Sequence, residues 1–271
     1  MSDHATQTVS SIPDYFAAII EIAESWNARR VWYRGMRRKD WALRPSAYRF
    51  EHAFDEESAM NVFWARGRSL RDFQDLESQR DWDWYFAARH HGLPTRLLDW
   101  SETPIVGLYF GLAGLEEGDA PRIWLLDPNA LNEAAYDDDC VYVPDSDRTR
   151  FVNRWLPKEV ERGKPTEFVH DEKSFDNRSP IALYPAHTNG RIIAQNGTFT
   201  VHGADDRPLE TQLGELAGRD EGPMRLTAVD LDPQAAPTMK RQLAQLGLTP
   251  YAVFPDGVHL AQHLTEYYGA S

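Results

Sequence analysis

The spacing of apolar and polar residues predicts a chain in which helices alternate with short strands. In several segments apolar side chains recur every three or four residues, as they do in helices with one buried face. These predicted helices are 11–26, 56–76, 81–91, 104–109, 233–246 and 258–267, and a further short helix starts at Asp127-Pro128. Short runs of β-branched and aromatic residues indicate strands. The predicted strands are 31–35, 93–100, 122–126, 181–184, 191–194, 198–202, 225–231 and 251–255.

Segments with neither pattern are predicted to be loops or disordered. We expect residues 1–10 to form a disordered N-terminus, 136–175 to be a long loop, and 205–222 to be a loop rich in Asp and Gly. Asn196-Gly197 lies between two predicted strands, and this dipeptide favours a tight β-hairpin turn. No repeat and no Gly/Ser linker divides the chain. We therefore predict an α+β fold, a single domain over residues 11–271 with a mixed, mainly antiparallel β-core flanked by helices.

Charge and cysteine content narrow the classes of function. The 271 residues include 29 Lys and Arg against 42 Asp and Glu, a formal net charge of −13. A negative field of this size opposes non-specific binding to nucleic-acid backbones, although the basic stretch 37–49 could guide one strand locally. The single cysteine, Cys140, excludes an intrachain disulfide and zinc sites built from cysteine pairs. Because the chain shows neither a secretory signal nor an apolar stretch of membrane-spanning length, we expect a cytoplasmic protein without a membrane partner.

Two separated motifs resemble the FRG domain family. The first is Tyr33-Arg34-Gly35, followed by WALRPSAYR, and the second is HHGLPTRLLDW, which begins at His90. Both motifs, and the predicted helix between them, agree with the family in order and spacing. The later segments RIIAQNGTFTVH and VFPDG are similar to that family's C-terminal blocks, with Gly257 in place of a usual apolar or acidic residue. The resemblance implies an FRG-like α+β domain over most of the chain.

The aromatic-Arg-Gly motif also resembles the first motif of Arg-type ADP-ribosyltransferases. That resemblance implies an ADP-ribosyltransferase-like fold in which Arg34 orients NAD, the co-substrate, and the Gly35 backbone pairs with the nicotinamide amide. A guanidinium offers phosphate oxygens a rigid fork, and glycine lets a planar ring approach the main chain. Bacterial enzymes of this type commonly act as toxins or in phage defence, and the resemblance implies that context here.

The other two transferase motifs match less closely. A short strand followed by a helix occurs at 95–100 and Pro104, but without the usual Ser-Thr-Ser. Where the family has a catalytic glutamate ahead of a late strand, this chain has Gln195, with Glu210 as a less well placed substitute. An amide can hold a ribose hydroxyl but lacks the charge that stabilises an oxocarbenium-like transition state. The resemblance implies catalytic roles for Arg34 and Gln195. The residues expected to contact the nucleotide are Tyr33, Arg34, Gly35, His91, Thr95, Arg96 and Asp99.

Structural roles for the same residues stay open. Asp99 lies on a predicted buried strand and needs a cation, because an unpaired buried carboxylate costs roughly several kcal/mol. Arg34 or Arg96 would supply that cation, and the arginine concerned would then be structural. His90 and His91 are adjacent and point about 100° apart on a helix, so they do not easily ligate one metal ion, and we expect no metal site.

Three functions remain as hypotheses. The first is an NAD-dependent ADP-ribosyltransferase or NAD glycohydrolase whose acceptor is a protein, a nucleic acid or a small molecule. The second is a non-catalytic module that binds a nucleotide or ADP-ribose, in which Arg34 and Arg96 hold phosphates. The third, a metal-dependent nuclease that uses His91 and Asp99, lacks a complete ligand set. The amide of Gln195 distinguishes the first two, because it favours binding or slow hydrolysis over efficient transfer.

Overall fold

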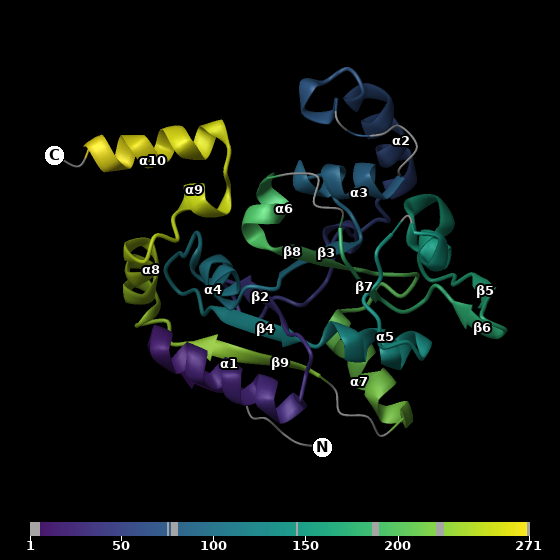
Figure 1. Ribbon diagram of the computed structural model, residues 1–271, viewed down its shortest axis with the longest axis horizontal. Coiled ribbons are helices and arrows are strands. Elements are labelled where there is room, and N and C mark those ends of the chain that lie inside the picture. The colour runs from purple at the N-terminus through teal and green to yellow at the C-terminus, as the bar shows by residue number, and fades with distance from the viewer. Residues whose placement is uncertain are drawn as a thin grey trace.

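The core of the fold is one large sheet. The structure, a computed structural model, describes residues 6–74, 76, 81–144, 146–185, 190–220 and 225–269. The strands of the sheet are β1 (Gln7–Val9), β2 (Trp32–Met36), β3 (Leu97–Ser101), β4 (Arg122–Leu126), β7 (Ile181–Leu183), β8 (Gly197–Val201) and β9 (Leu226–Leu231). They form a seven-stranded sheet of order β1-β9-β4-β2-β3-β8-β7 (Figure 1). β1 runs parallel to β9 and the other pairings of these strands are antiparallel, which confirms the expected mixed, mainly antiparallel sheet.

Helices flank this sheet, as expected (Figure 1). The helices of the described residues are α1 (Ile12–Trp26), α2 (Glu56–Gly67), α3 (Asp81–His90), α4 (Pro104–Leu112), α5 (Pro128–Tyr136), α6 (Gly190–Gln195), α7 (Leu209–Asp220), α8 (Ala236–Gln245), α9 (Pro250–Val253) and α10 (Gly257–Gly269), of which α10 projects away from the sheet. Turns of 3-10 helix occur at Ser46–Tyr48, Arg71–Phe73, Asp147–Trp155 and Pro157–Glu159, and β5 (Glu167–His170) pairs with β6 (Lys173–Asp176) in a separate small sheet. Within the described residues, no helix combines the length and the apolar character needed to cross a membrane.

Buried side chains divide the sheet into two faces. Apolar residues of α1, α4 and α8 pack on β2, β4 and β9, while those of α3 and the 147–155 segment pack on β3, β7 and β8. These two groups cover the same face, because Tyr33 of the first is the register partner of Ser101, which shares its face with Leu97 of the second. Residues of α5 and α7 pack against the opposite face. The helices of these two groups therefore cover one face of the sheet, and α5 and α7 cover the other.

The sheet opens between β2 and β3. β2 pairs with β4 from Trp32 to Met36, and β3 pairs with β8 from Leu97 to Ser101. Between β2 and β3 themselves, the register contains one pair, Tyr33 with Ser101. The strands diverge beyond that pair, which leaves room for side chains and for a ligand at the middle of the sheet.

Glycines let α4 lie directly on β2. A Cβ atom at Gly35 would stand 2.1 Å from the carbonyl oxygen of Gly107 and 2.2 Å from the amide nitrogen of Gly111. Both neighbours are backbone atoms that cannot rotate away. Gly35 is therefore required by the packing of the strand against the helix.

The ends of the chain and of one helix differ from the sequence expectations. Gln7–Val9, within the segment expected to be disordered, forms β1 because its backbone hydrogen-bonds to β9; residues 1–5 lie outside the described residues. The helix expected over 56–76 ends at Gly67, against whose Cα the ring of Trp84 packs so closely that a Cβ would be 2.8 Å away. The chain then turns, which brings Phe73 onto the same ring.

Five further expectations are wrong in the C-terminal half. The predicted strands 191–194 and 251–255 are the helices α6 and α9, and the loop 205–222 contains α7. The hairpin turn at Asn196-Gly197 is absent, because Asn196 adopts a left-handed φ of 42° at the junction between α6 and β8. The 136–175 segment holds 3-10 turns and the β5–β6 pair instead of one long loop. Helix α9 starts with a cap, since the Thr249 hydroxyl accepts a hydrogen bond from the amide of Ala252.

Candidate functional site

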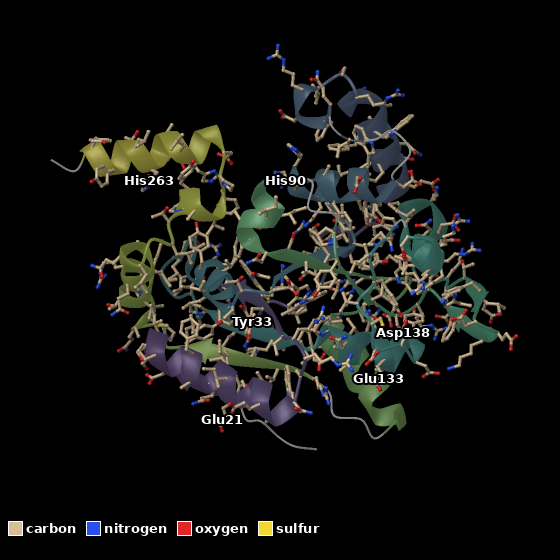
Figure 2. The ribbon with its side chains drawn as sticks, in the orientation of Figure 1. Glu21, Tyr33, His90, Glu133, Asp138 and His263 are labelled. Carbon is tan, nitrogen blue, oxygen red and sulfur yellow. The ribbon has the colours of Figure 1, made fainter. Side chains whose placement is uncertain are left out.

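A cavity of about 540 Å³ lies over the opening between β2 and β3. Its floor is formed by β2, β3 and β8, and its walls by α3, α4 and α6. Figure 1 shows these elements together at the centre of the molecule, and Figure 2 labels Tyr33 on β2 and His90 at the end of α3. Of the residues expected to form a site, the cavity is lined by Tyr33, Arg34, Gly35, His91, Asp99 and Gln195.

Arg34 lies in the opening between the two strands. Its Nη1 donates a hydrogen bond of 2.6 Å to the carbonyl oxygen of Asp99 and stands 3.6 Å from the Asp99 carboxylate. Its Nε is buried without a hydrogen-bond partner. Desolvation lowers the pKa of Arg34 to about 10 despite the attraction of Asp99. The guanidinium is thus a buried cation with unused donor capacity at the edge of a cavity.

Arg89 is the main partner of Asp99. Its Nε donates to both carboxylate oxygens at 3.2 Å, and its Nη2 also contacts Asp99, so the pair is bidentate. Burial raises the pKa of the Asp99 carboxyl, but the charge and hydrogen bonds of Arg89, assisted by Arg34, outweigh it and hold that pKa well below its ordinary value. Asp99 is therefore an anion that orients two arginines. The expected ion pair of Arg34 with Asp99 exists, but Arg89 shares the carboxylate.

A third arginine enters the cavity from α6. Arg191 lines it together with His90 of α3, whose backbone carbonyl accepts a 3.4 Å hydrogen bond from Arg191. Burial, and next the charge of Arg191, lower the pKa of His90 to about 4, so this imidazole is neutral at pH 7. Among the described residues that line the cavity, three arginines face a single carboxylate, Asp99. The cavity is locally positive in a protein of net charge −13.

Aromatic rings complete the walls. The rings that line the cavity are those of Tyr33, Phe86, Phe110 and Phe199. Phe86 and Phe199 stack on each other, with ring centroids 5.0 Å apart and an interplanar angle of 22°. A ligand of the right class would combine anionic groups with flat rings.

Gln195 lines the cavity from a different setting than expected. It ends helix α6 instead of preceding a strand in a hairpin. Its side-chain Nε2 donates to the carbonyl oxygen of Val253 at 3.1 Å, and its backbone carbonyl oxygen accepts a 2.6 Å hydrogen bond from the Ser101 hydroxyl. Among the described residues the side-chain oxygen of Gln195 has no hydrogen bond, so it can act as an acceptor.

Thr95 and Arg96 do not line the cavity. Thr95 is fully buried and exchanges hydrogen bonds with the 3-10 turn at Ser46, whose hydroxyl accepts from its amide at 3.2 Å. Arg96 is buried at 3 % exposure, and its Nε donates to Glu56 at 2.6 Å while its Nη atoms donate to backbone carbonyls. Arg96 therefore neutralises Glu56 inside the core and not Asp99. The expected substitute acid, Glu210, also lies elsewhere and accepts from the Leu43 amide.

His91 lines the cavity at its rim. It follows the last residue of α3, and the left-handed Gly92 (φ 88°) next to it turns the chain toward β3. The His91 ring packs edge-on against Phe73, with centroids 4.8 Å apart. His91 thus closes one end of the cavity and is held there by an aromatic contact.

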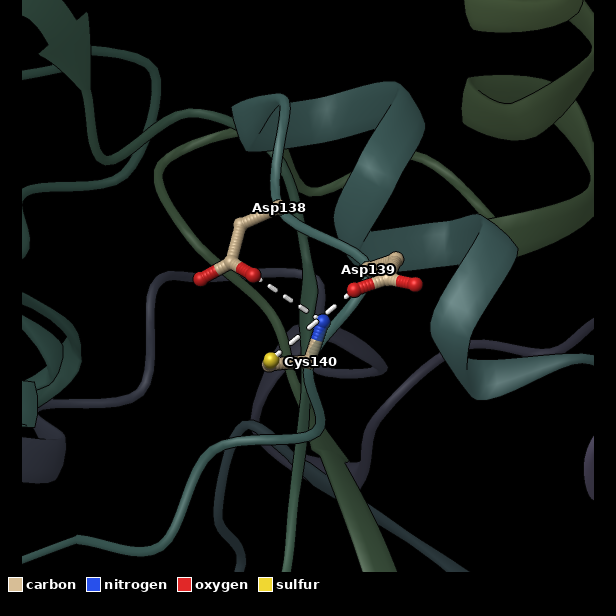
Figure 3. Close-up of side chains that lie close together, drawn as sticks. All are labelled: Asp138, Asp139 and Cys140. Atoms are coloured by element: carbon tan, nitrogen blue, oxygen red, sulfur yellow. Dashed lines mark hydrogen bonds between the residues drawn. The ribbon is translucent and has the colours of Figure 1, made fainter.

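Three neighbouring side chains outside the cavity could reach one metal ion. Asp138, Asp139 and Cys140 follow helix α5 on the surface (Figure 3). Hydrogen bonding to Asp138 and the nearby negative charges raise the pKa of the Cys140 thiol, which opposes metal binding by a thiolate. Asp139 is in addition 3.2 Å from Arg29. None of these three residues lines the cavity.

The comparison with protein families concerns the elements that carry this cavity. Residues 29–120 match the FRG domain. This FRG segment contains β2, α3, β3 and α4, and hence Arg34, Arg89 and Asp99, whereas α6 and β8 lie beyond it. No curated protein matches the chain, and no solved structure does.

Sequence reasoning missed Arg89 and Arg191. Arg89 lies one residue before the HHGLPTRLLDW motif, at the end of a predicted helix, so its closeness to the motif is visible in the sequence. Arg191 was assigned to a strand, where its side-chain direction could not be inferred. The signal that could have found both is the excess of arginine around the motifs of a very acidic chain.

Proposed function

We propose that the cavity at the opening of the sheet binds NAD or a related nucleotide such as ADP-ribose. In this proposal the pyrophosphate of the nucleotide contacts Arg34, Arg89 and Arg191, and the rings of the nucleotide pack on the aromatic walls of the cavity. This is the nucleotide-binding function that the residues of the cavity support best.

The observation that carries the proposal is the buried, incompletely paired guanidinium of Arg34. Within the described residues the guanidinium donates one hydrogen bond, to the Asp99 carbonyl, so an anionic ligand group in the cavity would supply it with a further partner. Arg89 and Arg191 add two further cations on the same cavity, against the one carboxylate that orients them. Arginine forks match phosphate oxygens in geometry, and a ligand with two adjacent phosphates would satisfy more than one of them.

The size and the aromatic walls agree with a nucleotide. A volume of about 540 Å³ falls in the range of small-molecule sites, and four aromatic rings line it. Tyr33 and Phe110 stand on the α4 side, and the stacked Phe86 and Phe199 on the α3 side. Each side offers a flat apolar surface to a base or a nicotinamide ring.

Cleavage of NAD is a second candidate, which the position of Gln195 favours. A side-chain amide at the cavity wall, whose oxygen has no partner among the described residues, can accept a hydrogen bond from a ribose hydroxyl. Among the described lining residues, Asp99 is the only carboxylate, and two arginines occupy it. We therefore propose slow glycohydrolase or transferase activity on an ADP-ribosyltransferase-like site, with nucleotide binding as the primary property.

Calorimetric titration with ADP-ribose tests the binding. We expect saturable binding that weakens as the salt concentration rises, because part of the affinity is electrostatic. Adenosine, which offers the base and the ribose without phosphates, serves as the control and should bind at least about tenfold more weakly. Equal affinity for the two ligands, or no binding of ADP-ribose, would exclude the pyrophosphate site. Chromatography of nicotinamide released from NAD then tests the second candidate separately.

A further inference from the structure

Helix α6 is contacted by the last residue of α9, Val253, and by the residue that follows it, Phe254. Two cavity residues of α6 take part. The amide of Gln195 donates to the Val253 carbonyl at 3.1 Å, and the guanidinium carbon of Arg191 lies 4.3 Å from the centroid of the Phe254 ring. Val253 and Phe254 therefore contact two of the three α6 residues that line the cavity.

Phe254 is itself fixed from three sides. Its ring stacks on the imidazole of His259, with centroids 4.8 Å apart and an interplanar angle of 18°. Its other contacts are edge-to-face, with Phe110 at 5.9 Å and Tyr109 at 6.4 Å, both on α4. The His259 ring is held in turn by Asp256, whose carboxylate oxygens lie 2.8 and 2.9 Å from Nδ1. The ring presented to Arg191 is thus part of a rigid aromatic group.

Arg191 depends on this ring for its position. Its one hydrogen bond within the described residues is the long one, of 3.4 Å, to the His90 carbonyl. The face of an aromatic ring carries partial negative charge and attracts a guanidinium that lies over it. Ordering a long arginine side chain costs conformational entropy. If the ring already holds Arg191 in place, the ligand does not pay that cost when it binds.

We propose that Phe254 is a positioning residue for ligand binding, which holds the Arg191 guanidinium at the cavity so that it meets an anionic group of the ligand already in place. This inference rests on the proposed function in taking that ligand to be a nucleotide pyrophosphate. It assigns a role to the C-terminal segment, which lies outside the FRG segment 29–120. The site is then completed by α6 and by the residues that follow α9.

The variant Phe254→Leu tests the role of the ring. Leucine keeps an apolar contact with α4 and removes the aromatic face. We expect Arg191 to react faster with phenylglyoxal, as measured by peptide mass mapping, and the affinity for ADP-ribose to fall about three- to tenfold. Phe254→Tyr should restore both. The matched control is Phe50→Leu, because Phe50 also stacks on a neighbouring ring, at 5.2 Å from Phe54, but is not the ring over which Arg191 lies.

The two measurements separate this inference from the function on which it rests. If Arg191 reactivity in Phe254→Leu equals that in Phe50→Leu, the ring does not position Arg191 and the inference is wrong. If reactivity rises and ADP-ribose affinity is unchanged, Arg191 does not meet the ligand and the inference is equally overturned. If the parent protein binds no ADP-ribose but Arg191 becomes reactive in Phe254→Leu alone, the positioning stands and the proposed nucleotide function fails.

Discussion

Replacing Arg34 by methionine should separate ligand binding from folding. Methionine has a similar length and no charge, so it fills much of the opening between β2 and β3 without a guanidinium. We expect Arg34→Met to fold with nearly the stability of the parent while losing most of its affinity for ADP-ribose. The usual expectation for a residue as buried as Arg34 is the reverse, namely a loss of stability.

The magnitude follows from the surroundings of Arg34. Burial lowers its pKa from 12.5 to about 10, so the charged form is about 3 kcal/mol less stable in the folded protein, at about 1.4 kcal/mol per pKa unit. Removing the charge relieves this cost, but the Asp99 carbonyl loses its donor, which costs about 1–3 kcal/mol. The two effects oppose each other, and the free energy of unfolding should change by no more than about 2 kcal/mol.

The sign of the pH dependence follows from the same shift. The folded-state pKa lies below that of the unfolded chain, so the cost is fully present at neutral pH. It diminishes as the pH rises through 10 toward 12.5, where the folded protein releases the proton first.

The expected loss of affinity follows from the hydrogen bond to phosphate. A charge-assisted hydrogen bond of this kind contributes about 1.5–3 kcal/mol, so its loss should weaken the affinity for ADP-ribose roughly ten- to a hundredfold.

Urea unfolding and calorimetric titration measure the two quantities on the same preparation. Arg38→Met is the matched control, because Arg38 is half exposed, pairs with Asp40 and does not line the cavity. It should leave both stability and affinity near the parent values. A loss of more than about 4 kcal/mol in Arg34→Met, with unaltered affinity in the protein that remains folded, would show that Arg34 is a structural residue.

Three further predictions follow from other residues. Gln195→Ala should slow the release of nicotinamide from NAD and Gln195→Glu should preserve or raise it, as measured by chromatography; an alanine variant as active as the parent would remove Gln195 from the mechanism. Gly35→Ala should lower the melting temperature sharply, with a loss of at least about 3 kcal/mol, because its Cβ has no space against the α4 backbone; a thermal melt like that of the parent would contradict the packing described. The third concerns His202, which is fully buried with both ring nitrogens unpartnered and whose pKa burial lowers to about 3. Its folded pKa is below its unfolded value of 6.5, so it supports folding above pH 6.5 and loses that contribution as the pH falls toward 3. Between pH 7 and pH 4.5, His202→Gln should therefore lose about 2 kcal/mol less stability than the parent in urea unfolding, and equal losses would mean that His202 is not buried as a neutral ring.

The elements that local chemistry determines were predictable from the sequence. β4 begins and ends as expected, and helix α5 begins at Asp127-Pro128 because an aspartate cap and a proline suffice to start a helix. Helix α3 ends at His90, just before the left-handed Gly92 (φ 88°), which is the stop signal that the sequence shows. In these segments the chain neighbours and the tertiary contacts favour the same structure.

The segments that were not predictable depend on distant contacts. Residues 191–194 are β-branched and apolar enough to read as a strand, but Ile192 packs over Gly197 as part of a helix. β1 is too short and polar to signal a strand, and exists because β9 offers it an edge.

The candidate site shows the same division. The motif residues Arg34 and Asp99 lie next to each other, as expected of two motifs that form one site. Arg96 and Thr95 stand in the same motif as Asp99, and their side chains were taken to face the same ligand. Arg96 forms an ion pair with Glu56 instead, a buried residue in the first turn of α2. A partner so far away in sequence cannot be read from the spacing of a motif, whereas the alternation of a strand can.

The position of bound ADP-ribose in a crystal structure tests the central claim most directly. We expect its pyrophosphate oxygens within hydrogen-bond distance of Arg34 and of Arg89 or Arg191, with the ribose beside Gln195. The Arg34 guanidinium, which within the described residues donates one hydrogen bond, to the Asp99 carbonyl, should then donate to the ligand as well. A ligand bound elsewhere on the surface, with these arginines in the same contacts as in the free protein, would contradict the assignment of this cavity as a nucleotide site.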